Sequence, residues 1–141
     1  MIFRIYIGFQ VSWNVEIYFI SITTMIKVKR IYEKPHKDDG YRVLVDKLWP
    51  RGVGKHEARL DEWFRSIAPS NGLRKWFNHD PDKWEEFKNR YRKELENNLQ
   101  EVSACQDKLR GKDRITFLFS SKELMNNHAH FLKNYFEELG W

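Results

Sequence analysis

The sequence has almost no cysteine, since Cys105 is the single one among 141 residues. A disulfide within the chain is therefore excluded, and there is no cluster of cysteines that would hold a metal ion. A reducing, cytoplasmic setting is the simplest interpretation. The chain also lacks an internal repeat, a low-complexity stretch and a linker between two domains. With 41% hydrophobic and 32% charged residues, its composition is typical of one globular domain.

Residues 1–24 have a pattern of their own. Every odd position from Phe3 to Phe19 is apolar, which is typical of a β-strand, but the segment is far longer than an ordinary strand. Polar residues in its middle disfavour a transmembrane helix, and the lone Arg4 without a small-residue cleavage site disfavours a signal peptide. We predict that the native chain starts at Met25 and that residues 1–24 are not part of it. The alternative is an added hairpin or an interaction strand.

Positive charge is in excess, and the excess lies in one stretch. Between Ile26 and Leu60 there are ten Lys or Arg against five acids, whereas residues 61–141 contain fourteen of each sign. The whole net charge of +5 therefore comes from this basic 26–60 region. Such a bias favours an anionic ligand or partner, and the alternative is a solvated basic edge without a function.

Hydrophobic periodicity predicts strands alternating with helices. Strands are expected at residues 26–32, 41–49 and 114–119. Helices are expected at 55–67, from the N-cap Ser70 to Phe77, from Pro81 to about residue 110 with a break near Asn97 and Asn98, and in a last segment that ends at Gly140. This order indicates an α/β fold, a small and partly parallel sheet flanked by helices, in a single domain over residues 25–141.

The first candidate site is the loop behind the predicted strand 41–49. Ligands of open α/β sheets bind just beyond the carboxyl ends of the strands. Glycines allow a close approach of the backbone, and Arg and Lys bind carboxylate or phosphate. The ligand-binding candidates here are Arg51, Gly52, Gly54 and Lys55. The spacing fits neither a Walker loop nor a dinucleotide-binding fingerprint, and the alternative is a tight surface turn.

The second candidate site is the loop behind strand 114–119. If this strand runs parallel to 41–49, both loops open on the same edge of the sheet. His128 would then lie in the first turn of the last helix, as a neutral base or hydrogen-bond donor. Ser121, or its neighbour Ser120, would act as a nucleophile only with a base in reach, and Lys122 would add a charge. The alternative is a capping cluster with a partly buried histidine.

Other candidates are weaker. His79 and Asp80 are more simply a turn residue and a helix cap than a catalytic pair. No metal site is predicted, because His128 and His130 are two residues apart and would point in different directions on a helix. Cys105 is interpreted as a packed small hydrophobic residue. No cofactor can be assigned.

Several segments agree in order and spacing with a known family. They are YRVLVDKLWPRG (41–52), LDEW (60–63), APS (68–70), LRKWFNHDP (73–81), WEEFKNRYRKEL (84–95) and NNHA (126–129). In these segments the chain resembles the YeaO-like branch of the family called domain of unknown function 488. The resemblance runs from Met25 to about Leu139 and implies a small, soluble, mostly bacterial or archaeal α/β protein. It implies no established activity, cofactor or catalytic residue.

Two classes of function fit these residues best. The first is an enzyme or binding domain for a phosphorylated or carboxylated small molecule, held in one pocket by the candidates of both loops. The second is a nucleic-acid-binding module that uses the basic 26–60 region, although no recognised binding motif is present. An interaction domain without chemistry is a third. A membrane partner is not expected, and the sequence does not reveal the oligomeric state.

Overall fold

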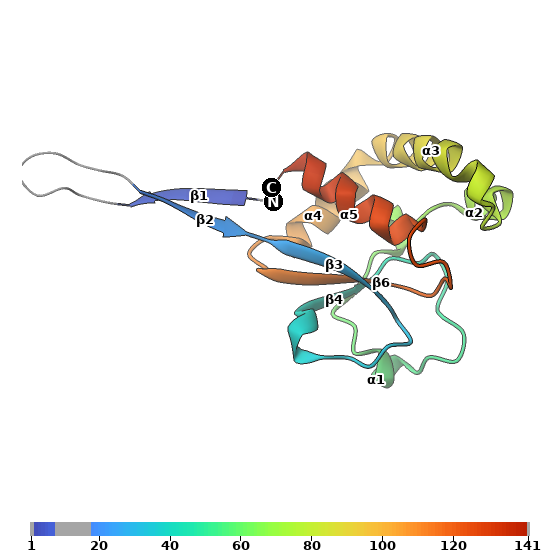
Figure 1. Ribbon diagram of the computed structural model, residues 1–141, viewed down its shortest axis with the longest axis horizontal. Helices are drawn as coiled ribbons and strands as arrows, with labels where there is room; N and C mark the ends of the chain where they lie inside the picture. The colour runs from blue at the N-terminus through green and yellow to red at the C-terminus, as the bar shows by residue number, and fades with distance from the viewer. Residues whose placement is uncertain (1, 8–17, 141) are drawn as a thin grey trace, which may run out of the picture.

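The computed structural model describes the backbone of residues 2–7 and 18–140 and the side chains of residues 24–140. Its centre is a sheet of four parallel strands, shown in Figure 1. They are β3 (Met25–Arg30), β4 (Tyr41–Leu44), β5 (Glu62–Trp63) and β6 (Arg114–Phe119), in the order β3-β6-β4-β5. The sheet confirms the predicted α/β class.

The predicted strand 114–119 is the central strand β6. Its last five residues are all buried, as expected for a parallel strand that is covered on both faces. Strand β4 is shorter than predicted, because the ladder ends at Leu44, although the N–H of Val45 still donates to Leu118 O at 3.0 Å. Residues 46–49 therefore already belong to the loop beyond the sheet.

Helices cover the sheet unequally. In Figure 1, α3 (Trp84–Glu96), α4 (Leu99–Leu109) and α5 (His128–Leu139) lie on one face, and the short α1 (Lys55–Ala58) lies on the other. Along β6, Phe117 belongs to the large core under the helices, whereas Leu118 belongs to a small cluster on the opposite face. The alternation of side chains along a strand thus divides the interior into two cores.

The remaining helices follow the predicted caps and breaks. Ser70 accepts a hydrogen bond from the N–H of Leu73 and starts α2 (Asn71–Phe77). Asp80 caps the 3₁₀ helix η3 (Pro81–Lys83), which leads into α3. The break near Asn97 and Asn98 is confirmed, since it separates α3 from α4. A further 3₁₀ helix, η1 (Lys37–Asp39), lies between β3 and β4.

The helix predicted at 55–67 is wrong. Arg59 adopts a left-handed conformation (φ 47°) and ends α1, after which the chain forms β5 and the 3₁₀ helix η2 (Arg65–Ile67). Trp63 packs in the small core and Phe64 in the large one. These neighbours point to opposite faces of the sheet, as side chains do in an extended chain. The apolar spacing in 55–67 that resembled one face of a helix therefore comes from an extended segment.

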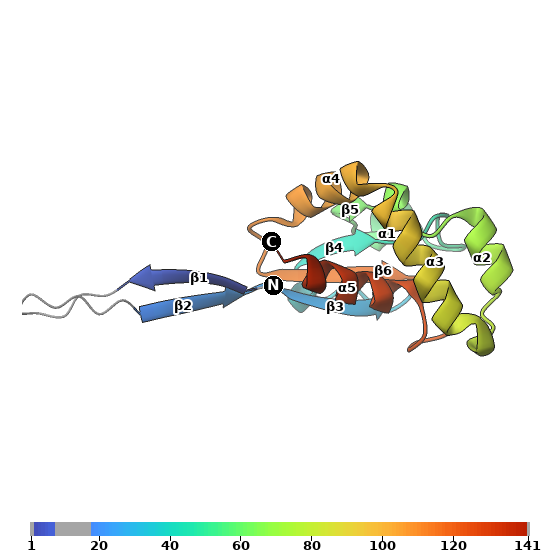
Figure 2. The ribbon, with the colours of Figure 1, turned by 90° about the horizontal axis from the view of Figure 1, so that it is seen from above.

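In the N-terminal segment, β1 (Ile2–Ile7) pairs antiparallel with β2 (Tyr18–Thr23), and Figure 2 shows this ribbon extending away from the sheet. This antiparallel pairing is the arrangement that the alternative, an added hairpin, predicts. Residues 8–17, which carry the middle of the period-two pattern, lie outside the described residues. The predicted start at Met25 stays a prediction. Among the described helices, none is long and apolar enough to cross a membrane.

Candidate functional site: a pocket at the carboxyl edge of the sheet

A pocket of about 690 Å³ lies at the carboxyl ends of the parallel strands. Its walls come from the turn after β3, the β4–α1 loop, α2 with the residues on either side of it, α3, and the segment between β6 and α5 with the first residue of α5. The lining consists of Tyr32, Asp46, Lys47, Leu48, Trp49, Pro50, Arg51, Pro69, Asn71, Arg74, Lys75, Phe77, Asn78, His79, Phe87, Ser120, Ser121, Asn127 and His128. We call it the carboxyl-edge pocket, and it lies where open α/β sheets bind ligands.

Three polar residues join two walls of this pocket. His128 Nε2 lies 2.8 Å from Asp46 Oδ1. The other carboxylate oxygen, Oδ2, accepts hydrogen bonds from Ser120 N at 3.0 Å and from Ser120 Oγ at 2.5 Å. Asp46 is 7% exposed, so its carboxylate is directed inward and is fully engaged. The first residues after β4 and β6 are thereby tied to the start of α5.

The electrostatics of Asp46 follow from these contacts. Burial raises the pKa of its carboxyl group, but the hydrogen bond and charge of His128 and the hydrogen bonds of Ser120 outweigh burial. The pKa of Asp46 therefore lies below its ordinary value, and the group is a carboxylate at neutral pH. An ionised carboxylate only accepts hydrogen bonds, so Nε2 of His128 carries a hydrogen.

This arrangement differs from a nucleophilic triad. In a triad the imidazole stands between the hydroxyl and the carboxylate and takes the hydroxyl proton. Here the carboxylate of Asp46 stands between Ser120 and His128, so the histidine does not contact the serine. The Ser121 hydroxyl has one hydrogen-bond partner in the described part of the chain, the N–H of Glu123 at 3.1 Å. The geometry positions an imidazole ring in the pocket and leaves both serines without a histidine base.

Within the described part of the chain, the cations of the pocket have no counter-ions. Among the described residues of the lining, Asp46 is the only acid, and it is occupied by His128 and Ser120. Lys47, Arg51, Arg74 and Lys75 form no ion pair with any residue in 24–140, whose side chains the structure describes. The charges from two separate walls therefore face a pocket in which only a ligand or solvent ions can balance them.

Helix α2 contributes one polar face to the pocket. Asn71, Arg74, Lys75 and Asn78 follow the i, i+3, i+4, i+7 spacing of a helical face and all line it. Arg74 Nη1 donates to Asn71 Oδ1 at 2.8 Å, which orients the guanidinium group. The opposite face of α2 is buried in the large core through Leu73 and Phe77. Core packing of the helix thus fixes the direction of its polar face.

The predicted site residues divide into two groups. Arg51, Ser121 and His128 line the pocket, so the structure brings residues of both predicted loops together. Gly52, Gly54, Lys55 and Lys122 are exposed and lie outside the lining. Gly52 has φ 78°, which a glycine tolerates readily. Tyr32 donates its hydroxyl hydrogen to Arg51 O at 2.8 Å, which fixes the turn that carries Arg51.

Several residues of the pocket were not predicted from the sequence, among them Asp46, Lys47, Arg74 and Lys75. Asp46 was counted only as a charge, although its position directly after a strand was a usable signal. Arg74 and Lys75 lie in a segment that was assigned only a helix, and nothing in the local pattern indicates which way that helix faces. His79 was treated as a turn residue, and the structure places it in the lining with a left-handed backbone (φ 55°).

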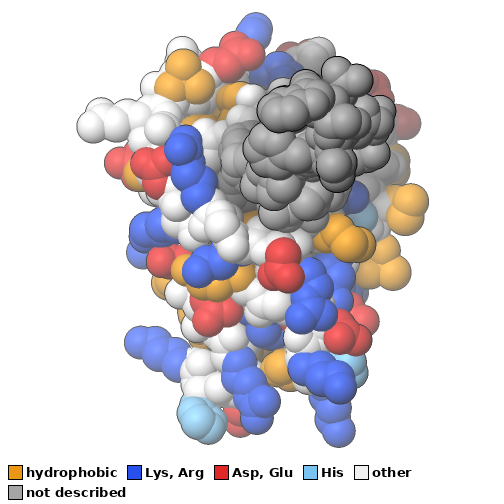
Figure 3. Space-filling view, turned by 90° about the vertical axis from the view of Figure 1, so that its left-hand side faces the viewer, with side chains coloured by type: hydrophobic (Ala, Val, Ile, Leu, Met, Phe, Trp, Pro, Cys, Tyr) orange, Lys and Arg blue, Asp and Glu red, His pale blue; other side chains and the backbone are white. Residues whose placement is uncertain are grey.

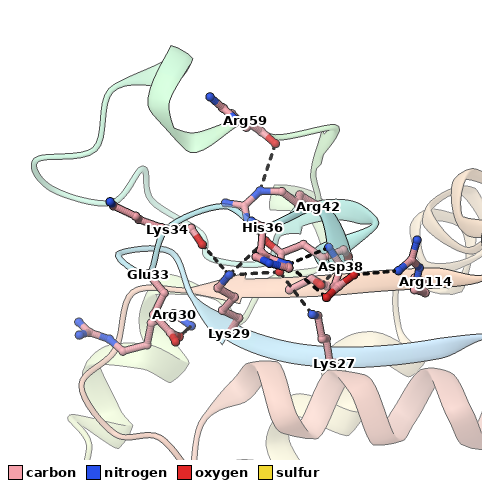
Figure 4. Close-up of polar contacts among 12 residues, drawn as sticks. Lys27, Lys29, Arg30, Glu33, Lys34, His36, Asp38, Arg42, Arg59 and Arg114 are labelled. Atoms are coloured by element: carbon pink, nitrogen blue, oxygen red, sulfur yellow. Dashed lines mark hydrogen bonds and ion pairs between the residues drawn. The ribbon is translucent and has the colours of Figure 1, made fainter.

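A second polar cluster surrounds Asp39 on the face of the sheet away from the large core. Figure 4 shows three of its members, Lys27, Lys29 and Arg42. Asp39 is 1% exposed and pairs with Lys27, Lys29 and Arg42 at 3.4, 3.1 and 2.5 Å. Its backbone oxygen accepts from the hydroxyl of Thr116 at 2.6 Å. This cluster fastens η1 to β3, β4 and β6, and three of the ten cations of the basic region are engaged in it.

Comparisons with known proteins agree with the sequence motifs. The family model described as "Inactive DUF488-N3 subclade" matches residues 25–139. The chain is 40% identical to the uncharacterized protein YeaO of Escherichia coli over 114 residues, 81% of this chain and 98% of that protein. It is 38% identical to the uncharacterized protein Rv3073c of Mycobacterium tuberculosis over 109 residues, 77% and 91% of the two chains. No solved structure matches the chain.

Proposed function

We propose that this chain, which belongs to the DUF488 family, binds a phosphorylated or carboxylated small molecule. The ligand would lie in the carboxyl-edge pocket. The observation that carries the proposal is the charge of the lining. Lys47 and Arg51 from one wall and Arg74 and Lys75 from another have no carboxylate partner there. Arginine binds carboxylate and phosphate through two parallel hydrogen bonds, and lysine adds a point charge.

The size and the apolar part of the lining support an organic ligand rather than a bare ion. The pocket volume of about 690 Å³ lies within the range of roughly 300–1,000 Å³ that is typical of sites for organic molecules. Aromatic and apolar side chains form much of its surface; they are Tyr32, Leu48, Trp49, Pro50, Pro69, Phe77 and Phe87. A ligand with a ring or short apolar body and an anionic group would satisfy both parts of the lining.

Binding without turnover is the form of the function that the contacts favour. The Asp46 carboxylate separates Ser120 from the imidazole of His128, and with its lowered pKa it is itself a weak base for a serine nucleophile. The description of the matching family model as inactive points in the same direction. The roles of Ser121 and His128 as catalytic groups are therefore not part of the proposal, and His128 is assigned to binding.

Nucleic acid is the alternative partner, and the structure gives it less support. Lys29 and Arg42 of the basic region are directed at buried Asp39 and are largely withdrawn from solvent. Arg30 is also engaged, because its guanidinium group donates to the carbonyls of Ser120 and Ser121 at 2.9 Å. Among the side chains coloured by type in Figure 3, basic and acidic ones lie next to one another on the face shown.

Isothermal titration calorimetry with phenyl phosphate, benzoate and sulfate tests the proposal. The two ring compounds are expected to bind more tightly than sulfate, on the order of tenfold for phenyl phosphate, because the ring buries apolar surface. Arg51→Gln is expected to weaken all three by roughly tenfold or more, since a charge-assisted hydrogen bond is lost. Lys55→Gln is the matched control, because Lys55 carries the same charge at the start of α1, directly after the loop of Arg51, but lies outside the lining.

Two results would contradict the proposal. One is the absence of binding by all three compounds. The other is an equal loss of affinity in Arg51→Gln and Lys55→Gln, which would indicate a general effect of net charge. A parallel titration with generic single-stranded RNA at increasing salt separates the alternative, because binding to a phosphate backbone falls steeply as salt rises. Tight, salt-sensitive RNA binding would favour the nucleic-acid function instead.

A further inference from the structure

One nitrogen of the His128 ring is committed to the protein, and the other is not. Nε2 lies 2.8 Å from Asp46 Oδ1 and carries the hydrogen of that bond. Among residues 24–140, no donor or acceptor contacts Nδ1. Because the ring lines the pocket, Nδ1 is the atom of His128 that is left for a ligand. Because Nε2 keeps its hydrogen in both protonation states, Nδ1 has a lone pair in the neutral ring and an N–H in the imidazolium.

The protonation of His128 decides what Nδ1 offers to a ligand. With a hydrogen on Nε2, the neutral ring has only a lone pair at Nδ1, which repels an anion. The imidazolium has an N–H at Nδ1, which donates to an anion. Without a ligand, the cations of the lining oppose this charged form, whereas the carboxylate of Asp46 supports it. A bound anion adds negative charge beside the ring and favours the charged form further.

We infer, resting on the proposed function, that His128 binds the anion through Nδ1–H and takes up one proton when the ligand enters, with Asp46 as its positioning residue. The charged and titratable groups around the ring are Asp46 from the β4 end, Lys47 and Arg51 from the β4–α1 loop, Arg74 and Lys75 from α2, His79 from the turn behind α2, Tyr32 from the segment after β3, and Glu123 from the loop before α5. Of these, His79 is the other histidine.

Sulfate is the appropriate probe, because it stays fully ionised between pH 5.5 and 8.5. Calorimetric titrations over this range give the dissociation constant, and buffers of different ionisation enthalpy give the number of protons taken up. The wild-type affinity is expected to fall as the pH rises, by up to about tenfold per pH unit, with an uptake approaching one proton where the ligand-free ring is neutral. In His128→Gln, the pH dependence and the proton uptake are expected to disappear.

Two matched variants assign the effect. His130→Gln changes another histidine of α5 that lies outside the lining and packs against Phe119, and it is expected to keep the wild-type pH dependence. His79→Gln tests the other titrating group of the pocket. If this variant rather than His128→Gln removes the pH dependence, the inference is overturned.

The outcomes for the two proposals can be told apart. Sulfate binding that does not depend on pH, or that keeps its dependence in His128→Gln, overturns the role of His128 and leaves the anion pocket in place. If neither sulfate nor phenyl phosphate binds at any pH, the proposed function fails and this inference fails with it. Loss of both pH dependence and proton uptake in His128→Gln, with both retained in His79→Gln, supports both.

Discussion

The Asp39 cluster is expected to have a large effect on stability, because its carboxylate and its arginine partner are both buried. Asp39 is 1% exposed and Arg42, which pairs with it, is 4% exposed. Arg42 also donates to the carbonyls of Ala58 and Arg59, so its guanidinium group cannot move out to solvent without breaking these bonds. In Asp39→Asn the geometry is nearly preserved, but Arg42 and Lys29 lose the negative charge that balances them.

The expected loss in the free energy of unfolding is about 3–5 kcal/mol, the usual cost of leaving a buried charge without its partner. The pH dependence gives a second magnitude. Burial raises the pKa of Asp39, but the His36 N–H, Lys29 and Arg42 outweigh it and hold the pKa at about 2. A carboxyl group of ordinary pKa near 3.8 that is shifted to this value contributes about 2 kcal/mol.

The sign of this contribution follows from the lowered pKa. The stabilisation is fully present above about pH 4, where the unfolded chain is also ionised, and it is lost as the pH falls toward about 2. Below pH 4 the free energy of unfolding of the wild type is therefore expected to fall more steeply than that of Asp39→Asn. Asp46, whose pKa is also lowered, contributes a remaining dependence in both proteins.

Urea unfolding followed by tryptophan fluorescence at pH 7, 4 and 3 measures both effects. Asp38→Asn is the matched control, because Asp38 is the neighbouring acid and its side chain is 58% exposed. Its pairs with His36 and Arg114 at 3.3 and 3.4 Å are surface pairs, worth about 0–1 kcal/mol. A change below about 1 kcal/mol in Asp39→Asn, or equal changes in both variants, would refute the role assigned to Asp39.

Two further predictions concern single sites in the fold. Gly40→Ala is expected to destabilise the protein by more than about 2 kcal/mol, because a Cβ there would lie 2.3 Å from Arg114 O on a residue with φ 64°. In Gly72→Ala in α2, the added Cβ meets nothing within 4 Å, and the free energy of unfolding is expected to rise by up to about 1 kcal/mol. Equal effects of the two substitutions in thermal unfolding would contradict this. Burial raises the pKa of the Cys105 thiol to about 11, so a thiol reagent such as DTNB is expected to react slowly at pH 8 with the folded protein and rapidly in denaturant; rapid reaction of the folded protein would contradict the burial.

How far the sequence predicted the fold depended on how local each signal was. The caps at Ser70 and Asp80, the break at Asn97 and the buried strand 114–119 are encoded within a few residues, and all are confirmed. The segment 55–67 failed because an extended chain that places Trp63 and Phe64 in different cores has apolar residues at the same positions as a helix would. Periodicity over so short a segment cannot separate the two.

The same distinction applies to the candidate site. Arg51 was found because a strand end is visible in the sequence, and parallel strands bring their ends to one edge. Asp46 was not found, because the residues that it contacts, Ser120 and His128, lie 74 and 82 positions away in the sequence. The cations of α2 depend on which face of the helix the core buries. Contacts of this kind follow from the packed fold and not from spacing along the chain.

The central claim is that the carboxyl-edge pocket binds an anionic ligand. An NMR titration of the ¹⁵N-labelled protein with phenyl phosphate is the most direct test of this binding. The amide signals of residues 46–51, 71–79 and 120–128 are expected to shift together and to give one dissociation constant. In Arg51→Gln the same signals are expected to shift only at higher ligand concentration. Shifts centred on residues 27–39 around the Asp39 cluster, or no saturable shifts at all, would contradict the account.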